Sequence, residues 1–414
     1  MERKLKVLAW SDCVFAPTGF GTVSRHVLAA LHATGKYQID QLAINYHGDF
    51  FDTTQYPYQI SPAKLLDRSD PFGKVQLIRS LQRGDYDLLW ILNDPHIVSA
   101  VVPELEKLKK EKAARHAPVF RVIYYYPVDC TITPQASQMI PFADAAVTYT
   151  HWAREQTLKR MPDLSRPPHV IYHGTDPRNF HPLDAATRST VRTNYFRLAN
   201  PDTFLLINVN RNMARKDIPR TLLAYAEFRK HVPNSMLYLH TAMRDDDIEL
   251  LQCCRWLGLR VPGDVLFPLA SSLSEGIPIC ELNKLYNAAD AFLTTTLGEG
   301  WGLTITEAMA AGVPVIAPDN SSIPEILGND HDRGYVYPCK ELTWVDNAGY
   351  RPVGSLEDIL NKITECYMQR NTSPQREITS RAMHFVKDHS WEKICVQWVE
   401  LVDQVSHETP AKAL

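Results

Sequence analysis

Two glutamates stand eight positions apart around a glycine-rich turn, in the segment Glu299-Gly-Trp-Gly-Leu-Thr-Ile-Thr-Glu307. The segment continues into Gly312, Pro314 and an apolar run, which predicts a loop, a short helix and a buried strand. A helix start carries free amides and a partial positive charge, so it suits a phosphate. Carboxylates repel a phosphate but accept strong hydrogen bonds from neutral hydroxyls. A ligand with hydroxyls on both sides of a phosphate is a nucleotide sugar, and the segment predicts this ligand.

Part of this segment also has a purely structural interpretation. Thr304 and Glu307 have the spacing of a capping box, in which Glu307 serves only its own helix. Glu299 stands in a loop between two glycines and has no comparable structural role. The next loop, residues 319–325, has the pattern of a turn followed by a capping box, so structure alone explains it.

A basic loop offers partners for a diphosphate. Arg211 and Lys216 follow an apolar strand candidate, and Asp217 is expected to cap a helix over Ile218–His231. Ligands of open α/β sheets bind outside the carboxyl ends of strands, where this loop is expected. Arginine provides forked hydrogen bonds and lysine a compact charge, so Arg211 and Lys216 are predicted to clamp the diphosphate. Taken alone, a basic loop is more often a solvated surface.

A second glycine-rich turn, with Gly19 and Gly21, follows the first strand candidate. Glycines let amides approach an anion at a helix start, but two glycines are a weak signal and also fit a tight turn. The dinucleotide fingerprint requires a third glycine, where the chain has Ser24, and an acid ending strand two, whereas Asp40 is expected before that strand. A nicotinamide enzyme is therefore disfavoured.

Polar residues also follow the strand candidates of the first half of the chain. They include Asp94, His96, Asp129 and His151, and they converge only if the sheet is parallel. Each one alone is more often structural than catalytic. Asp129 follows a Tyr-Tyr-Tyr-Pro-Val run and is the best candidate for a residue near the reacting carbon. The acidic run at residues 245–247 precedes a helical pattern at Ile248–Trp256 and is expected to cap it, so no metal site is predicted.

Short apolar runs alternate with amphipathic segments, which favours an α/β fold with helices on parallel sheets. The strand candidates are Lys6–Trp10, Gln41–Asn45, Leu88–Leu92, Phe120–Tyr125, Ala145–Thr148, His169–Tyr172, Phe204–Val209, Met236–His240, Asp264–Phe267, Ala291–Thr294 and Val313–Ala317. The clearest helices of the first half are Thr22–His32, Pro103–His116 and Ala153–Arg160. We predict two doubly wound domains, residues 1–176 and 177–389, and a C-terminal helical segment, residues 390–414.

The bulk composition is that of an ordinary soluble protein. The 414 residues are 45% hydrophobic and 22% charged, and the length predicts more than one domain. A net charge of −3 gives no general attraction to nucleic acid or anionic membrane. The eight cysteines show no CxxC spacing, which favours reduced thiols and a cytoplasmic location. No run of 18 apolar residues predicts a membrane span.

Together these segments resemble the retaining glycosyltransferases of family 4, which have the GT-B fold. The resemblance covers most of the chain and rests on five segments. They are Glu299-Gly-Trp-Gly-Leu through Glu307-Ala-Met and Gly312-Val-Pro-Val, the loop Arg211 to Asp217, the linker His173-Gly-Thr-Asp176, and, more weakly, Gly19-Phe-Gly21 with Asn287-Ala-Ala-Asp290.

The resemblance implies two Rossmann-like domains facing a central cleft, with the acceptor mostly in the first and the donor in the second. Glu299 would hold sugar hydroxyls and Glu307 the ribose. The diphosphate would be bound by Arg211, Lys216, the amides of Gly302 and Leu303, and the Gly19–Gly21 turn. Asp94, His96 and His151 would lie on the acceptor side. Relatives often place a histidine near the donor sugar, and this chain offers Asp129 there instead.

The implied reaction moves a sugar from a UDP- or GDP-sugar to a hydroxyl acceptor, with retention of configuration and without cofactor or metal. Three alternatives stay open at this stage. The acceptor can be a hydroxylated DNA base, although the charge does not favour nucleic acid. The enzyme can be a sugar-nucleotide epimerase or phosphorylase of the same fold. The chain can also be a non-catalytic sugar-nucleotide binder, although Glu299 and both basic residues are present.

Overall fold

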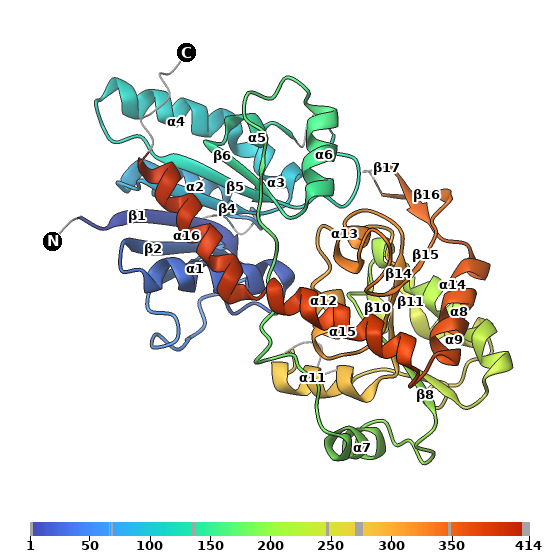
Figure 1. Ribbon diagram of the computed structural model, residues 1–414. Helices are drawn as coiled ribbons and strands as arrows, with labels where there is room; N and C mark the ends of the chain where they lie inside the picture. Colours follow the sequence, from blue (N-terminus) through green and yellow to red (C-terminus); the bar gives the residue numbers. More distant parts are fainter. Residues whose placement is uncertain are drawn as a thin grey trace. The chain divides into compact units, whose positions relative to one another are not determined.

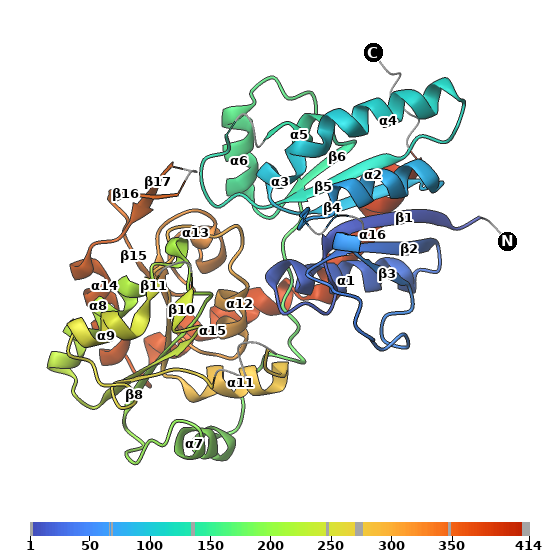
Figure 2. The same cartoon turned by 180° about the vertical axis from the view of Figure 1, so that it is seen from behind.

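A computed structural model describes residues 3–65, 67, 69–133, 137–245, 248–269, 276–346 and 349–407. It divides into two compact units (Figures 1 and 2). Unit 1 comprises Met1–Val128, Ile132–His173 and Trp391–Leu414, and unit 2 comprises Asp129–Thr131 and Gly174–Ser390. Among the described residues, no helix is both long and apolar enough to cross a bilayer.

Unit 1 is built on a seven-stranded sheet of the described residues, in which each neighbouring pair is parallel and the order is β3-β2-β1-β4-β5-β6-β7. Its strands are β1 (Leu5–Asp12), β2 (Tyr37–Ile44), β3 (Gln59–Pro62), β4 (Leu88–Leu92), β5 (Arg121–Tyr126), β6 (Ala145–Thr148) and β7 (His169–Val170). Its helices are α1 (Gly19–Ala33), α2 (Lys74–Arg83), α3 (Pro95–Val98), α4 (Val102–Ala114), α5 (Met139–Phe142), α6 (His151–Arg160) and α16 (Trp391–His407).

Both faces of the unit 1 sheet are covered because successive side chains of a strand point to opposite faces. Leu89 and Ile91 of β4 join the core beneath α2 and α4. Trp90, between them, meets Trp398 of α16 at a ring-centroid distance of 5.8 Å. Helix α16 packs beside α1 (Figure 1), so this last described helix is part of unit 1.

Unit 2 has a six-stranded sheet of described residues, again with parallel neighbours, in the order β12-β9-β8-β13-β14-β15. Its strands are β8 (Phe204–Val209), β9 (Ser235–His240), β12 (Val265–Leu266), β13 (Ala291–Leu293), β14 (Val315–Pro318) and β15 (Tyr335–Tyr337). Its helices are α7 (Ala185–Asn194), α8 (Ile218–His231), α9 (Leu250–Trp256), α11 (Ile279–Ala288), α12 (Leu303–Ala310), α13 (Ile323–Leu327), α14 (Leu356–Met368) and α15 (Ser373–Asp388). Two antiparallel pairs complete it, β10 (Arg244–Asp245) with β11 (Ile248–Glu249) and β16 (Glu341–Asp346) with β17 (Gly349–Val353).

The predicted α/β class with two parallel sheets is confirmed. Leu88–Leu92, Ala145–Thr148, Phe204–Val209 and the helix Ile218–His231 have the predicted bounds. Two placements were wrong: β2 begins at Tyr37, so Asp40 lies inside it, and the predicted helix Ile248–Trp256 begins only at Leu250. Of the acidic run before it, Asp245 ends β10, and residues 246 and 247 lie outside the described part.

Candidate active site

The loop after β13 places Glu299 at the carboxyl edge of the unit 2 sheet. A turn of 3₁₀ helix that follows β8, η4 (Ala214–Lys216), contacts this loop. The amide of Leu297 donates a hydrogen bond to the carbonyl of Arg215 at 2.8 Å. The carboxylate of Glu299 accepts hydrogen bonds from Lys216 Nζ and, at 3.3 Å, from Arg215 Nη1. Glu299 is 7% exposed. The residue that the sequence singled out is thus a buried carboxylate held by two cations.

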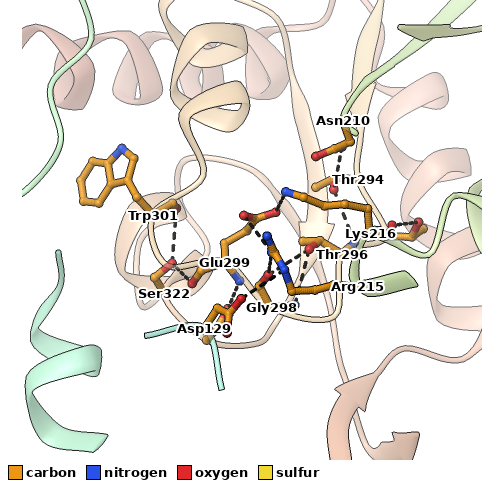
Figure 3. A network of polar contacts seen from close by, with 12 residues as sticks. Asp129, Asn210, Arg215, Lys216, Thr294, Thr296, Gly298, Glu299, Trp301 and Ser322 are labelled. Carbon is orange, nitrogen blue, oxygen red and sulfur yellow. Dashed lines mark hydrogen bonds and ion pairs between the residues drawn. The ribbon is translucent and has the colours of Figure 1, made fainter. Parts of the chain in front are cut away.

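Two further residues extend this ion-pair arrangement, and Figure 3 shows one of them, Asp129, beside Arg215. Arg215 Nε lies 3.1 Å from Asp129 Oδ2, and Arg351 Nη1 on β17 donates to the carbonyl of Asp129 at 3.1 Å. Arg351 also lies 3.4 Å from Asp129 Oδ1 and is 3% exposed. We call Asp129, Arg215, Lys216, Glu299 and Arg351 the Glu299 network. Of these five side chains, three are cationic and two are carboxylates.

Backbone geometry fixes the position of Asp129 against the Glu299 loop. A Cβ atom on Gly298 would lie 2.2 Å from the carbonyl oxygen of Asp129 and 2.9 Å from Arg351 Nη1. Gly298 has φ +156°, and its own carbonyl accepts hydrogen bonds from Arg215 Nη1 and, at 3.0 Å, from Thr296 Oγ1. Only glycine allows this approach without displacement of the backbone.

The loop after β14 supports the Glu299 loop from the other side. The Ser321 hydroxyl accepts a hydrogen bond from the Glu299 amide at 2.8 Å. The Ser322 hydroxyl donates a hydrogen bond to the Glu299 carbonyl at 2.7 Å. Ser322 makes no side-chain capping bond to α13, so the capping box predicted for residues 319–325 is wrong. Its serines serve the neighbouring loop because Ser322 is itself in helical backbone conformation, not in the extended conformation of a capping residue.

The start of α12 provides the amides predicted for a phosphate. Gly302 precedes the helix with φ +105°, and the first amide bonds run from Ile305 and Thr306 to the Gly302 carbonyl. The helix geometry therefore leaves the amides of Gly302, Leu303 and Thr304 without intrahelical acceptors. The helix begins at Leu303, so Thr304 is not a capping residue, and the capping box of Thr304 and Glu307 is wrong.

The two glutamates of the motif sit in opposite electrostatic environments. Burial alone would raise the pKa of Glu299, but the charges of Lys216 and Arg215 lower it to about 2. Glu307 faces Tyr286, whose hydroxyl donates to Oε2 at 2.9 Å. Burial raises the pKa of Glu307 to about 7, against a smaller opposing effect of Tyr286. Glu299 is therefore ionised at neutral pH, whereas Glu307 titrates near pH 7.

Arg215, and not Arg211, is the arginine of the basic loop that contacts Glu299. Arg211 has a side chain that is 67% exposed, and its Nε lies 2.9 Å from Asp245 Oδ2. Arg215, four residues later, contacts Glu299 instead. Asp217 stands at the predicted N-cap position of α8 but makes no side-chain cap and pairs with Arg220. The adjacency of Arg215 to Lys216 in the sequence was the available signal for Arg215.

The predicted residues of unit 1 lie along one edge of its sheet. Asp94 and His96 follow β4, and His151 opens α6 after β6, so all three are at the carboxyl edge of parallel strands. His96 and His151 are exposed. Asp129 follows β5 in the chain but belongs to unit 2.

The first glycine turn has a structural explanation. Gly21 lies in the first turn of α1, which begins at Gly19, and its amide donates to Thr18 Oγ1 at 3.0 Å. A Cβ atom on Gly21 would lie 2.5 Å from the carbonyl oxygen of Ala16. Close packing accounts for this glycine, and its amide already has an acceptor. In the part of the chain that the structure describes, no group of three His, Cys, Asp or Glu side chains is arranged to hold a metal.

The part of the chain that carries these motifs is similar to known proteins. Residues 274–344, which include both glutamates, match the family model described as glycosyl transferases group 1. The chain is 33% identical over 124 residues to O-antigen chain mannosyltransferase B of Escherichia coli, covering 30% of this chain and 27% of that protein. The aligned segment thus spans about a quarter of that relative. The predicted resemblance to glycosyltransferases is thus confirmed at the level of group 1.

Solved structures share the fold over nearly the whole chain. A glycosyltransferase of Rickettsia africae superposes with a TM-score of 0.71 and 12% identity, covering 99% of this chain and 100% of that one. Anabaena HepE in complex with UDP-glucose gives a TM-score of 0.69 with 17% identity, covering 97% and 100%. The predicted GT-B class, with two Rossmann-like sheets, is therefore confirmed.

Proposed function

We propose, from the similarity to group 1 glycosyltransferases, that this protein transfers a sugar from a nucleotide-diphosphate sugar to a hydroxyl acceptor. The observation that carries the proposal is the Glu299 network beside the start of α12 in unit 2. Its three cationic side chains and the amides at the start of α12 suit a diphosphate. The match at residues 274–344 and the UDP-glucose complex of a protein of the same fold support the same ligand.

In this proposal each acidic side chain binds hydroxyls. A carboxylate has about four acceptor positions, so Glu299 can keep Lys216 and Arg215 and still accept sugar hydroxyls. Glu307, four residues into α12 from Leu303, would accept the ribose hydroxyls. Lys216, the amides of Gly302 and Leu303 and a reoriented Arg211 would hold the diphosphate. The Arg211 side chain is 67% exposed, so solvent screens its pairing with Asp245.

The proposed reaction proceeds with retention of configuration and without a bound metal. The bond between the anomeric carbon and the diphosphate oxygen breaks, and the acceptor oxygen bonds to that carbon on the same face. The acceptor proton passes to the departing phosphate oxygen, so no side chain has to act as nucleophile. Lys216 and the helix-start amides stabilise the charge that develops on the leaving group.

Asp129 is proposed to position this site. Its Oδ2 is 3.1 Å from Arg215 Nε and its Oδ1 3.4 Å from Arg351, so both oxygens are engaged by guanidinium groups. A carboxylate held in this way is a poor nucleophile, and it orients Arg215 toward Glu299. Asp94, His96 and His151 are the proposed acceptor-side residues, because ligands of parallel sheets bind at the carboxyl edge.

The test is a thermal-shift panel of UDP-, GDP- and ADP-sugars, since a ligand that binds only the native state raises the melting temperature. We expect one nucleotide class to stabilise the wild-type protein, and Lys216→Ala and Arg211→Ala each to abolish that shift, measured from each variant's own baseline. Arg381→Ala is the control, because Arg381 is exposed and pairs with Asp332. An unchanged shift in both Lys216→Ala and Arg211→Ala would contradict the proposal.

A further inference from the structure

A second cluster of charges lies in unit 2, built around the buried carboxylate of Asp290, whose side chain is 3% exposed. Three guanidinium groups surround it. Arg188 Nη2 lies 2.7 Å from Oδ1, Arg192 Nη1 3.1 Å from Oδ2, and Arg370 Nε 3.2 Å from Oδ1. Oδ2 also accepts a hydrogen bond from the amide of Leu205 at 2.8 Å. One carboxylate therefore faces three cations.

The remaining bonds of these arginines do not neutralise them. Arg192 donates to the carbonyls of Ala288 and Pro201, and Arg370 to the carbonyl of Asp202. The buried Nε of Arg370 reaches Asp290 as an ion pair without hydrogen-bonding geometry. Burial lowers the pKa of Arg192, and the charges of Arg188 and Arg370 add to this effect against the pull of Asp290. The three guanidinium groups thus repel one another.

A cavity of about 270 Å³ opens beside this cluster. Arg188 and Arg370 line it together with Arg376, which is exposed and donates to the carbonyl of Asn371 at 2.6 Å. Asp290 is the acidic residue of the lining. The cavity therefore has three arginines and one carboxylate on its walls.

The cavity is separate from the Glu299 network. Asp290 immediately precedes β13, and Val313 and Pro314 precede β14, so the cavity lies at the amino edge of these parallel strands. Glu299 lies beyond the carboxyl end of β13. Helix α12 likewise begins near Glu299 and ends at Ala310, and the two residues that follow it, Ala311 and Gly312, line the cavity.

We infer that this cavity, hereafter the Asp290 pocket, binds a phosphate group, either inorganic phosphate or a small phosphomonoester. Guanidinium groups match phosphate oxygens with paired, charge-assisted hydrogen bonds. A bound phosphate adds negative charge beside the three arginines that surround Asp290. The volume is slightly below the roughly 300–1,000 Å³ of typical small-molecule pockets, which favours a small phosphate compound over a nucleotide. The inference does not depend on the proposed transfer reaction.

The experiment is titration calorimetry of the full chain with inorganic phosphate, and separately with glycerol 3-phosphate, at constant ionic strength. We expect saturable binding that is at least tenfold weaker in Arg376→Gln. Arg376 is the informative position because it bonds to the carbonyl of Asn371, so its removal leaves the pairs of Asp290 in place. Arg381→Gln, on the same helix and outside the pocket, is the matched control and should bind like the wild type.

Lys216→Ala separates this pocket from the proposed donor site, which also has affinity for phosphate. Binding that persists in Lys216→Ala and weakens in Arg376→Gln supports the inference. Equal affinity of the wild type and Arg376→Gln, loss of binding in Lys216→Ala, or no saturable binding at millimolar phosphate would each overturn it. The two probes distinguish the ligand sources: tighter binding of glycerol 3-phosphate indicates a phosphomonoester, and tighter binding of inorganic phosphate indicates the free ion.

Discussion

Glu299 and Glu307 are chemically identical side chains to which the fold gives different proton affinities. Lys216 and Arg215 overcome the burial of Glu299 and lower its pKa to about 2, whereas burial beside Tyr286 raises the pKa of Glu307 to about 7. The sequence spacing of eight residues predicted both as ligand-binding carboxylates. It could not predict this difference, because the difference depends on the burial of Glu307 and on the charges of Lys216 and Arg215, which are 83 and 84 residues from Glu299 in the chain.

Glu307 should make stability depend on pH. Its folded pKa of about 7 is above the ordinary 4.5, so between these values the folded state binds more protons than the unfolded state. The contribution of Glu307 to stability should therefore fall as pH rises from about 4.5 to 7, by on the order of 1–3 kcal/mol. Because buried His173, whose pKa is lowered, acts in the opposite direction, the test is the difference in unfolding free energy between the wild type and Glu307→Gln, measured by urea denaturation across this range. This difference should shift with pH in the direction that destabilises the wild type, and a difference that does not change with pH would contradict the assignment. Glu299 titrates below this window.

Gly298 should tolerate no side chain. In Gly298→Ala the new methyl group would meet the Asp129 carbonyl, which predicts a loss of about 1–3 kcal/mol in stability and weaker nucleotide-sugar binding. Denaturation and calorimetry measure the two effects. Gly258→Ala is the control, because Gly258 also has positive φ but no atom within 4 Å of the added Cβ. Wild-type affinity in Gly298→Ala would show that this loop does not shape the site.

At the scale of elements, the parallel strands and their following helices were predictable, and the β16–β17 hairpin was not. Apolar runs such as Phe204–Val209 are buried on both faces and are therefore continuous in the sequence. In the hairpin, Trp344 and Tyr350 pair across the strands yet are 61% and 64% exposed, so hydrophobicity does not report burial there. Arg351 consequently escaped prediction, since its partner Asp129 is 222 residues away.

Helix α16 should contribute substantially to the stability of unit 1. Trp398 is fully buried, with its ring 4.7 Å from that of Tyr125 and 5.8 Å from that of Trp90. Trp398→Ala should cost about 3–5 kcal/mol in urea denaturation followed by circular dichroism. Val396→Ala, at a position that is 55% exposed, should cost little. Equal effects of the two substitutions would mean that α16 does not anchor through this tryptophan.

At the scale of the whole molecule, alternation of apolar runs and helices was sufficient to predict two parallel sheets. The net charge of −3 conceals clusters of cationic side chains at the Glu299 network and at the Asp290 pocket. The pocket was not predictable, because it joins α7, the segment before β13 and α15, which are separated by many residues. The acceptor was not predictable either, since Asp94, His96 and His151 are common residues of strand ends.

The proposed reaction should retain the configuration of the transferred carbon. We expect slow transfer of the sugar from an α-linked nucleotide donor to water to release the α anomer first. Proton NMR within the first minutes, before mutarotation, measures this anomer. Lys216→Ala should lower the rate by about 10²–10³-fold, because it removes a charge that stabilises the leaving group. Initial release of the β anomer would contradict retention.

The central claim is that a nucleotide sugar binds at the Glu299 network, and a crystal structure of the protein with the UDP- or GDP-sugar selected by thermal shift tests it most directly. We predict diphosphate oxygens within about 2.7–3.2 Å of Lys216 Nζ and of the Leu303 amide, with sugar hydroxyls on Glu299. A nucleotide bound elsewhere, with the pair of Lys216 and Glu299 shielded from it, would contradict the claim.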